Sequence, residues 1–139
     1  MFEHLDFKGR KHRGSKAQRL TMWKHRTIQE HVEHTAHRCG IHISRVCAWG
    51  TSKLAFDGSG AVTRDEHNHS LAVFPNGKQY NCDLSASYNI GARYFIREHL
   101  KPLSVTARSS LEAKVPSVKR RTSCTLDTLR RVHTALAAA

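Results

Sequence analysis

Lysine and arginine are the side chains of this sequence most able to support a chemical function, which would be phosphate binding. The 139 residues include 23 Lys and Arg against 11 Asp and Glu, a formal net charge of +12. Residues 1–30 hold 8 basic and 3 acidic residues, residues 91–139 hold 10 and 3, and residues 31–90 hold 5 of each. Each basic group that neutralises a phosphate releases counterions and adds affinity. Two basic ends around a neutral middle favour a nucleic-acid ligand over a merely solvated surface.

The predicted phosphate contacts fall into two groups. The first is a basic loop and the polar face of the helix after it: Lys8, Arg10, Lys11, Arg13, Lys16, Arg19, Lys24 and Arg26. The second lies on a later helix and comprises Arg93 and Arg97. Both groups would give affinity without base specificity. Trp23 could stack on a base, although a tryptophan in an apolar helical pattern more often belongs to a core.

Thiols and imidazoles do not form a recognisable zinc motif. Cys39, Cys47, Cys82 and Cys124 include no CxxC pair, so we expect four reduced cysteines, some of them in the core. The histidines that recur from His31 to His37 share no obvious spacing with a carboxylate or thiolate. No zinc is therefore expected.

The elements that must position these groups follow from periodicity and from helix-breaking residues. A helix is predicted from an N-cap at Ser15 to a stop at Gly40, and a short β-branched strand follows it. A turn is predicted at Asn76-Gly77, before a second helix that starts near Asp83 and ends at Pro102. Its predicted apolar face is Leu84, Tyr88, Ala92, Phe95, Ile96 and His99. The tail is interpreted as a basic linker, including Pro116 and residues 119–121, and a last amphipathic helix.

The size and hydropathy of the chain narrow the class of protein. A chain of 139 residues is long enough for one domain with a modest core. No apolar run approaches the roughly 20 residues of a membrane span, and the first residues are unlike a secretory signal. We therefore expect a cytoplasmic protein.

Three stretches, in this order, carry a resemblance to a known family. They are Phe2-Glu3-His4-Leu5-Asp6, then Gly40 to Val46 with Trp49-Gly50-Thr51-Ser52-Lys53, and then Asp83-Leu84-Ser85-Ala86-Ser87-Tyr88-Asn89-Ile90. The chain resembles the C-terminal half of TnpB-type proteins (the OrfB family), transposon-encoded relatives of the type V CRISPR effector nucleases. The last stretch is similar to the family's Asp-x-Asn-Ala-Ala-x-Asn-Ile motif, matching at Asp83, Ala86, Asn89 and Ile90. The resemblance covers residues 1 to about 100.

The resemblance implies an α/β fold with α+β content. It would be an incomplete RuvC-like, RNase H-type fold that lacks its first strands, with a small loop or hairpin insert and a C-terminal helical tail. The implied divisions are residues 1–48 as partial core, 49–82 as target-nucleic-acid-binding insert, 83–101 as last core helix, and 102–139 as linker and helix. Thr51, Ser52 and Lys53, which open the insert, would contact nucleic acid.

The resemblance also implies an acidic metal site. Glu3 and Asp83 would be the second and third acidic motifs of a Mg²⁺-dependent nuclease, and would converge although they are 80 positions apart. Hard Mg²⁺ prefers carboxylate oxygens, and two ions can stabilise the attacking and leaving oxygens of a phosphodiester. Without the resemblance, Asp83 reads as a helix N-cap and Glu3 as a solvated terminal residue.

Two departures from the family pattern qualify this picture. The family's first catalytic Asp would lie upstream of Glu3, so the chain is expected to be inactive alone, marginal in stability and in need of a partner. The four positions of the family's zinc-binding cysteines hold other residues, so the insert is expected to pack through Leu54, Phe56, Leu71, Val73 and Phe74.

Two classes of function remain open. The first is a DNA-binding fragment of an RNA-guided endonuclease, with DNA and possibly guide RNA as partners, or one half of a split nuclease whose upstream half is separate. The alternative is a non-catalytic nucleic-acid-binding or regulatory remnant. Mg²⁺ is expected only if the missing half is supplied.

Overall fold

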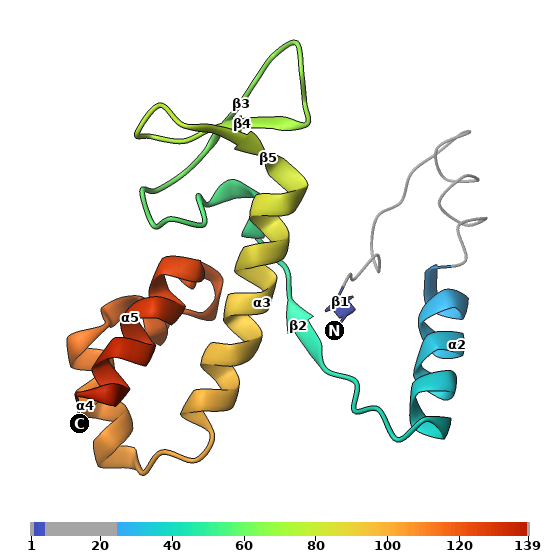
Figure 1. Cartoon of the computed structure of the whole chain (residues 1–139), viewed down its shortest axis with the longest axis vertical. Helices are drawn as coiled ribbons and strands as arrows, with labels where there is room; N and C mark the ends of the chain where they lie inside the picture. The colour runs from blue at the N-terminus through green and yellow to red at the C-terminus, as the bar shows by residue number, and fades with distance from the viewer. Residues whose placement is uncertain (1, 5–24, 139) are drawn as a thin grey trace, which may run out of the picture. The chain divides into compact units, whose positions relative to one another are not determined.

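The computed structural model describes residues 2–4 and 25–138 (Figure 1). The chain divides into two compact units, residues 1–45 and residues 46–139. The predicted Ser15 N-cap lies outside the described residues.

The described part of the first unit consists of strand β1 (Phe2–His4) and helix α2 (His25–Arg38). The helix stops at Gly40 as predicted, with Gly40 in the left-handed region at φ 68°. The amide of Ile41 donates to the carbonyl of Ala36 at 2.8 Å, and the amide of Gly40 donates to His37 at 3.0 Å. This pair of bonds is the Schellman motif, which satisfies carbonyls left without partners at a helix end.

The second unit opens with short elements. Strand β2 (Arg45–Cys47) starts at the last residue of the first unit and leads into the 3₁₀ helix η1 (Thr51–Lys53). Strands β3 (Thr63–Arg64), β4 (Leu71–Val73) and β5 (Gln79–Asn81) then form an antiparallel sheet in the order β3-β4-β5. The predicted turn is confirmed: β4 and β5 pair with Val73 opposite Gln79, and Gly77 closes the connection at φ 81°.

The side chains that pack together between residues 54 and 82 differ in part from those predicted. The buried residues of this stretch are Ala55, Ala72, Phe74 and Cys82, with Phe56, Val62 and Tyr80 partly buried against them. The contributions predicted for Phe56 and Phe74 are confirmed. On β4, however, the short Ala72 side chain faces inward and its larger neighbours Leu71 and Val73 are only half-buried. Successive side chains on a strand point to opposite faces, so burying Ala72 turns both neighbours outward.

Helix α3 (Cys82–Leu100) is the long element of the second unit, and Asn81 is its N-cap. The Asn81 side-chain oxygen accepts from the amides of Asp83 at 3.0 Å and Leu84 at 2.9 Å. The alternative reading of Asp83 as an N-cap is therefore wrong. Asp83 lies in the first turn, where its negative charge is favourable to the helix dipole.

The buried face of α3 also differs from the prediction. It consists of Cys82, Ser85, Asn89, Ala92, Arg93 and Ile96. Leu84, Tyr88 and Phe95 of the predicted apolar face are exposed instead. The buried face is mostly small or polar because it packs against η1, and Arg93 takes up main-chain carbonyls of the segments around it.

The tail is folded throughout and contains no extended linker. Helix α4 (Val105–Lys114) is followed by the short helices η2 (Pro116–Lys119) and η3 (Arg121–Ser123) and by α5 (Leu126–Ala137). The last helix was predicted. Helix α4 was not, although Ser104 caps it by accepting from the amide of Ala107 at 3.3 Å.

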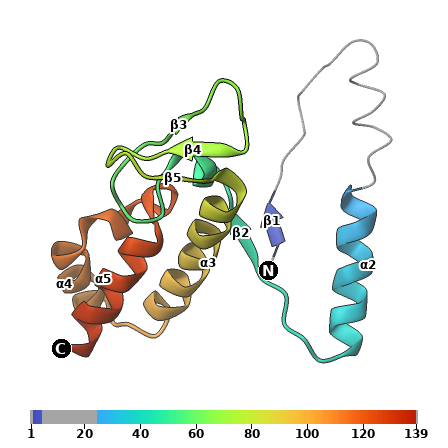
Figure 2. The ribbon, with the colours of Figure 1, turned by 45° about the horizontal axis from the view of Figure 1, so that its top comes forward.

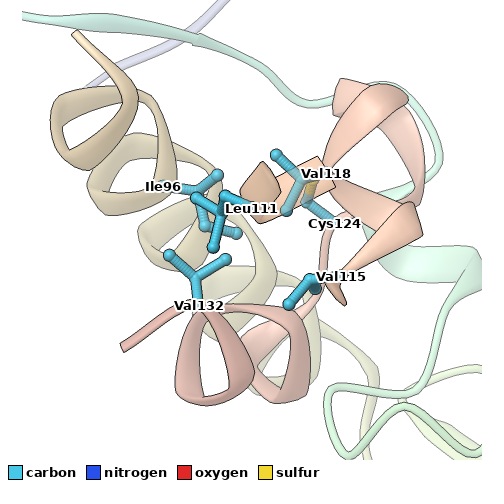
Figure 3. Close-up of a cluster of buried hydrophobic side chains, with 6 residues drawn as sticks. All are labelled: Ile96, Leu111, Val115, Val118, Cys124 and Val132. Carbon is cyan, nitrogen blue, oxygen red and sulfur yellow. The ribbon is translucent and has the colours of Figure 1, made fainter. Parts of the chain in front are cut away.

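Residues of α3 and the tail share one hydrophobic core (Figure 3). Its buried members are Ile96, Leu111, Val115, Val118, Cys124 and Val132. In Figure 2, α3, α4 and α5 lie beside one another, with the three-stranded sheet near the start of α3. The predicted division between residues 83–101 and 102–139 therefore runs through a single core.

The described residues make a mixed fold of four α-helices and a small three-stranded antiparallel sheet, in agreement with the predicted α+β content. None of the helices described is long and apolar enough to cross a membrane.

Candidate nucleic-acid interface

Arg93 does not occupy the position predicted for a phosphate contact. It is 6% exposed, and its guanidinium donates to four main-chain carbonyls. Those carbonyls belong to Cys47 at 2.8 Å, Trp49 at 2.9 Å, Thr122 at 2.6 Å and Cys124 at 3.3 Å. Burial lowers the pKa of Arg93, but a guanidinium remains protonated in proteins. Its donors are used internally, so the predicted contact is replaced by a structural one.

Thr51 is likewise an interior residue. Its side chain is buried, and its hydroxyl donates to the carbonyl of Ala48 at 2.8 Å. The buried amide of Asn89 donates to the carbonyls of Thr51 at 3.0 Å and Leu54 at 2.9 Å. Two stretches singled out in the sequence are thus joined by one side chain. Thr51 holds the turn in place and offers no group to a surface ligand.

Ser52, Lys53 and Arg97 have more accessible side chains. Ser52 is half-buried and Lys53 is exposed. Arg97 is about one-third exposed, lies 3.2 Å from a carboxylate oxygen of Glu98, and stacks over Tyr94 at 5.5 Å from the ring centroid. A hydrogen bond from Lys101 lowers the pKa of Glu98. Arg97 therefore belongs to a local ion-pair cluster with Glu98 and Lys101.

The remaining predicted basic contacts belong to the start of the chain. Lys8, Arg10, Lys11, Arg13, Lys16, Arg19 and Lys24 lie outside the described residues, as does Trp23. Arg26 is in α2. Their contacts with phosphate remain predictions.

The two acidic positions lie in different units. Glu3 is in β1 and Asp83 is in the first turn of α3, where its side chain is exposed. Residues 2–4 and 25–138 contain no group of three or more His, Cys, Asp and Glu side chains that could hold a metal ion. A pair of Mg²⁺ ions needs several converging carboxylates, and Asp83 has no such group of donors among the described residues of its own unit.

An aromatic cluster surrounds one lysine at the sheet. The Phe56 ring lies 5.5 Å from Phe74, 4.9 Å from Tyr80 and 5.2 Å from Tyr88 between centroids. The Lys78 ammonium lies 4.8 Å from the Phe56 centroid and 5.2 Å from that of Tyr80. A hydrogen bond with Tyr88 raises the pKa of Tyr80. These contacts pack Phe56, the β4–β5 hairpin and the start of α3 against one another.

The thiols divide evenly between surface and interior. Cys39 and Cys47 are exposed, whereas Cys82 and Cys124 are buried, and all four are free. Burial raises the pKa of Cys124, which belongs to the core shared by α3 and the tail.

One group of surface residues was missed by sequence reasoning. Trp49 is 71% exposed, and Lys119, Arg120 and Arg121 are exposed where η2 ends and η3 begins. The signal available was the position of Trp49 outside any apolar periodicity. The basic run at residues 119–121 is part of the predicted linker, and its sequence gives no sign that it lies on a folded segment.

No protein-family model, curated protein or solved structure matches this chain.

Proposed function

We propose that this chain is the DNA-binding C-terminal part of a TnpB-like RNA-guided endonuclease with a RuvC-like core. The support is the agreement between three motifs and the elements that carry them. Glu3 lies in a strand, Thr51 to Lys53 form a short 3₁₀ helix before the small sheet, and Asp83 lies in the first turn of a long helix. The net charge of +12 supports a polyanionic ligand.

The basic residues near the start of the chain carry most of the proposed affinity. Arg93 is removed from the proposed interface because its guanidinium is buried. Lys53 and Arg97 remain candidate contacts. Contacts to phosphate oxygens would position the nucleic acid without reading its sequence.

Catalysis by these 139 residues alone is not proposed. The sequence contains two of the three acidic motifs that the resemblance implies, Glu3 and Asp83. A separate polypeptide that supplies the first Asp would complete the set. Mg²⁺ would then polarise the phosphodiester, and these carboxylates would be among its ligands.

Binding is tested by measuring the dissociation constant for duplex and single-stranded DNA across a salt series. The expected result is a linear fall of log affinity with log salt, with a slope of roughly 0.9 per contacted phosphate on duplex DNA. Replacing Lys8, Arg10, Lys11 and Arg13 by Ser should reduce this slope. Failure to bind either DNA at low salt would overturn the proposal.

Cleavage is tested by adding the chain to an upstream polypeptide that carries the missing Asp, with Mg²⁺ present. Under the nuclease proposal cleavage appears and is lost in Asp83→Asn, while nucleic-acid affinity is retained. A second candidate is a non-catalytic binding module, because the net charge of +12 favours a polyanionic ligand without requiring a metal site. It predicts no cleavage under any combination and indifference of binding to Glu3→Ala and Asp83→Ala.

A further inference from the structure

We infer that Trp49 and the basic segment Lys119–Arg121 form a second nucleic-acid surface, which binds a single strand by stacking one base and contacting its phosphates. The inference rests on the proposed function only for the class of ligand. It assigns the contact to Trp49, which was not among the predicted contacts, and to the tail, which lies beyond the resemblance.

Trp49 combines an exposed side chain with a fixed main chain. Its side chain is 71% exposed, the highest value after Val105 among the large apolar residues whose exposure the structure describes. The main chain at the same residue is fixed, because its carbonyl accepts from Arg93 at 2.9 Å. An indole that is held by its main chain but left open to solvent is available to stack on a flat partner.

The main chain of the basic segment is anchored at the same side chain as that of Trp49. Thr122, the residue after Arg121, accepts from the same Arg93 guanidinium at 2.6 Å. The main chains that carry Trp49 and Arg121 therefore meet at one buried side chain. Lys119, Arg120 and Arg121 are exposed on the segment that precedes Thr122, so a run of cations and an open indole are carried by main chains that share one anchor.

An exposed indole and a run of cations favour a single strand over a duplex as the ligand. A cluster of cations beside an exposed aromatic ring suits a strand whose phosphates pair with the cations and whose bases are free to stack. Duplex DNA keeps its bases stacked on each other, so it could use the cations but not Trp49. No Asp or Glu occurs between Glu112 and Asp127, so no acidic residue of this segment offsets the cations.

The surface is preorganised by the fold. Thr122 and Cys124 are both tied to Arg93, and the Ser123 hydroxyl donates to the carbonyl of Arg120 at 2.8 Å. Val118 and Cys124 anchor the segment in the hydrophobic core on either side of the arginines. Binding therefore does not have to order this part of the main chain, a cost that otherwise reduces affinity.

The experiment measures affinity of the full chain for a labelled thymidine oligonucleotide and for an abasic oligomer of equal length. Trp49→Ala should weaken binding to the thymidine strand about tenfold and leave the abasic strand almost unchanged. Trp49→Phe should restore most of the loss. Phe95→Ala is the matched control, because Phe95 is also exposed, at 51%, and should have no effect.

The charge is tested with Arg120→Gln/Arg121→Gln against Arg130→Gln/Arg131→Gln, since the second pair is also exposed and removes the same charge. The first variant should lower the salt slope on single strands by about 1.4, or about 0.7 per phosphate, and the second by much less. Equal slopes in the two variants, or equal loss on both strands in Trp49→Ala, would overturn the inference and leave the proposed function standing. Absence of any nucleic-acid binding by the wild-type chain would overturn both.

Discussion

At the scale of single residues, Arg93 is the position where the predicted role and the observed one differ most. Its place four residues before Arg97 on a helix predicted a shared basic face. The structure instead directs Arg93 inward, to carbonyls of Cys47, Trp49, Thr122 and Cys124. Those carbonyls come from segments 29 to 46 positions away along the chain. Periodicity within one helix contains no information about such partners, so the error was not avoidable from the local pattern.

Replacing Arg93 should therefore affect stability more than binding. Arg93→Ala removes the buried donor to four main-chain carbonyls and is expected to lower the free energy of unfolding by about 3 kcal/mol. Arg97→Ala, on the same helix but about one-third exposed, should cost less than about 1 kcal/mol. Urea unfolding followed by circular dichroism measures both. An Arg93→Ala chain with wild-type stability and weakened DNA binding would return Arg93 to the interface.

The buried thiol of Cys124 makes stability depend on alkaline pH. Burial raises its pKa in the folded state, with the positive charge of Arg93 opposing the shift. The neutral thiol is thus favoured by folding. Its contribution is complete below the ordinary thiol pKa of about 8.5 and is lost as pH rises through that value towards the folded pKa.

Urea titrations at neutral pH and above the thiol range test this dependence. The unfolding free energy should fall at alkaline pH in the wild type and in Cys39→Ser, whose thiol is exposed. The fall should be smaller in Cys124→Ala, although that variant starts from a lower stability because it leaves a cavity. An identical alkaline loss in all three proteins would exclude Cys124 as its source.

At the scale of elements, helix ends and turns marked by glycine were predicted correctly. A helix with few apolar residues was not. Gly40 and the Asn76-Gly77 turn mark a helix end and a hairpin through backbone conformations that glycine favours, and both predictions are confirmed. Helix α4 was missed because Leu111 is its only buried residue and most of its other side chains are polar or charged. A helix with so little apolar periodicity depends on tertiary packing, which a local pattern does not report.

Helix α4 should nevertheless contribute strongly to stability through that one residue. Leu111 is 4% exposed within the core of α3 and the tail, whereas Val105 of the same helix is 84% exposed. Leu111→Ala should lower the free energy of unfolding by about 2 to 4 kcal/mol, and Val105→Ala should change it by less than about 0.5 kcal/mol. Chemical denaturation measures the difference. Equal effects would mean that α4 is not docked on its core.

At the scale of the whole molecule, the α+β content was predicted from the sequence. The contribution of the tail to the core of the second unit was not. The resemblance suggested a partial fold that needed a partner for its exposed apolar face. Leu84, Tyr88 and Phe95 are indeed exposed on α3. The opposite face, however, packs on η1 and α5, and Ile96 joins a core completed by Val118 and Val132. The tail, which lies beyond the resemblance, supplies what the family motifs did not predict.

This shared core implies that α3 and α5 unfold together. Because Ile96 and Val132 belong to one buried cluster, neither helix can leave without exposing the apolar surface of the other. Native-state amide exchange on the full chain should therefore give the slowest amides of both helices the same free energy of opening. Val132→Ala, at a residue with 0% exposure, should lower both values by the same amount, about 1 to 3 kcal/mol. A selective loss in α5, with α3 still protected, would show that α3 is stabilised by the insert instead, and uniform rapid exchange would mean that the second unit has no stable core.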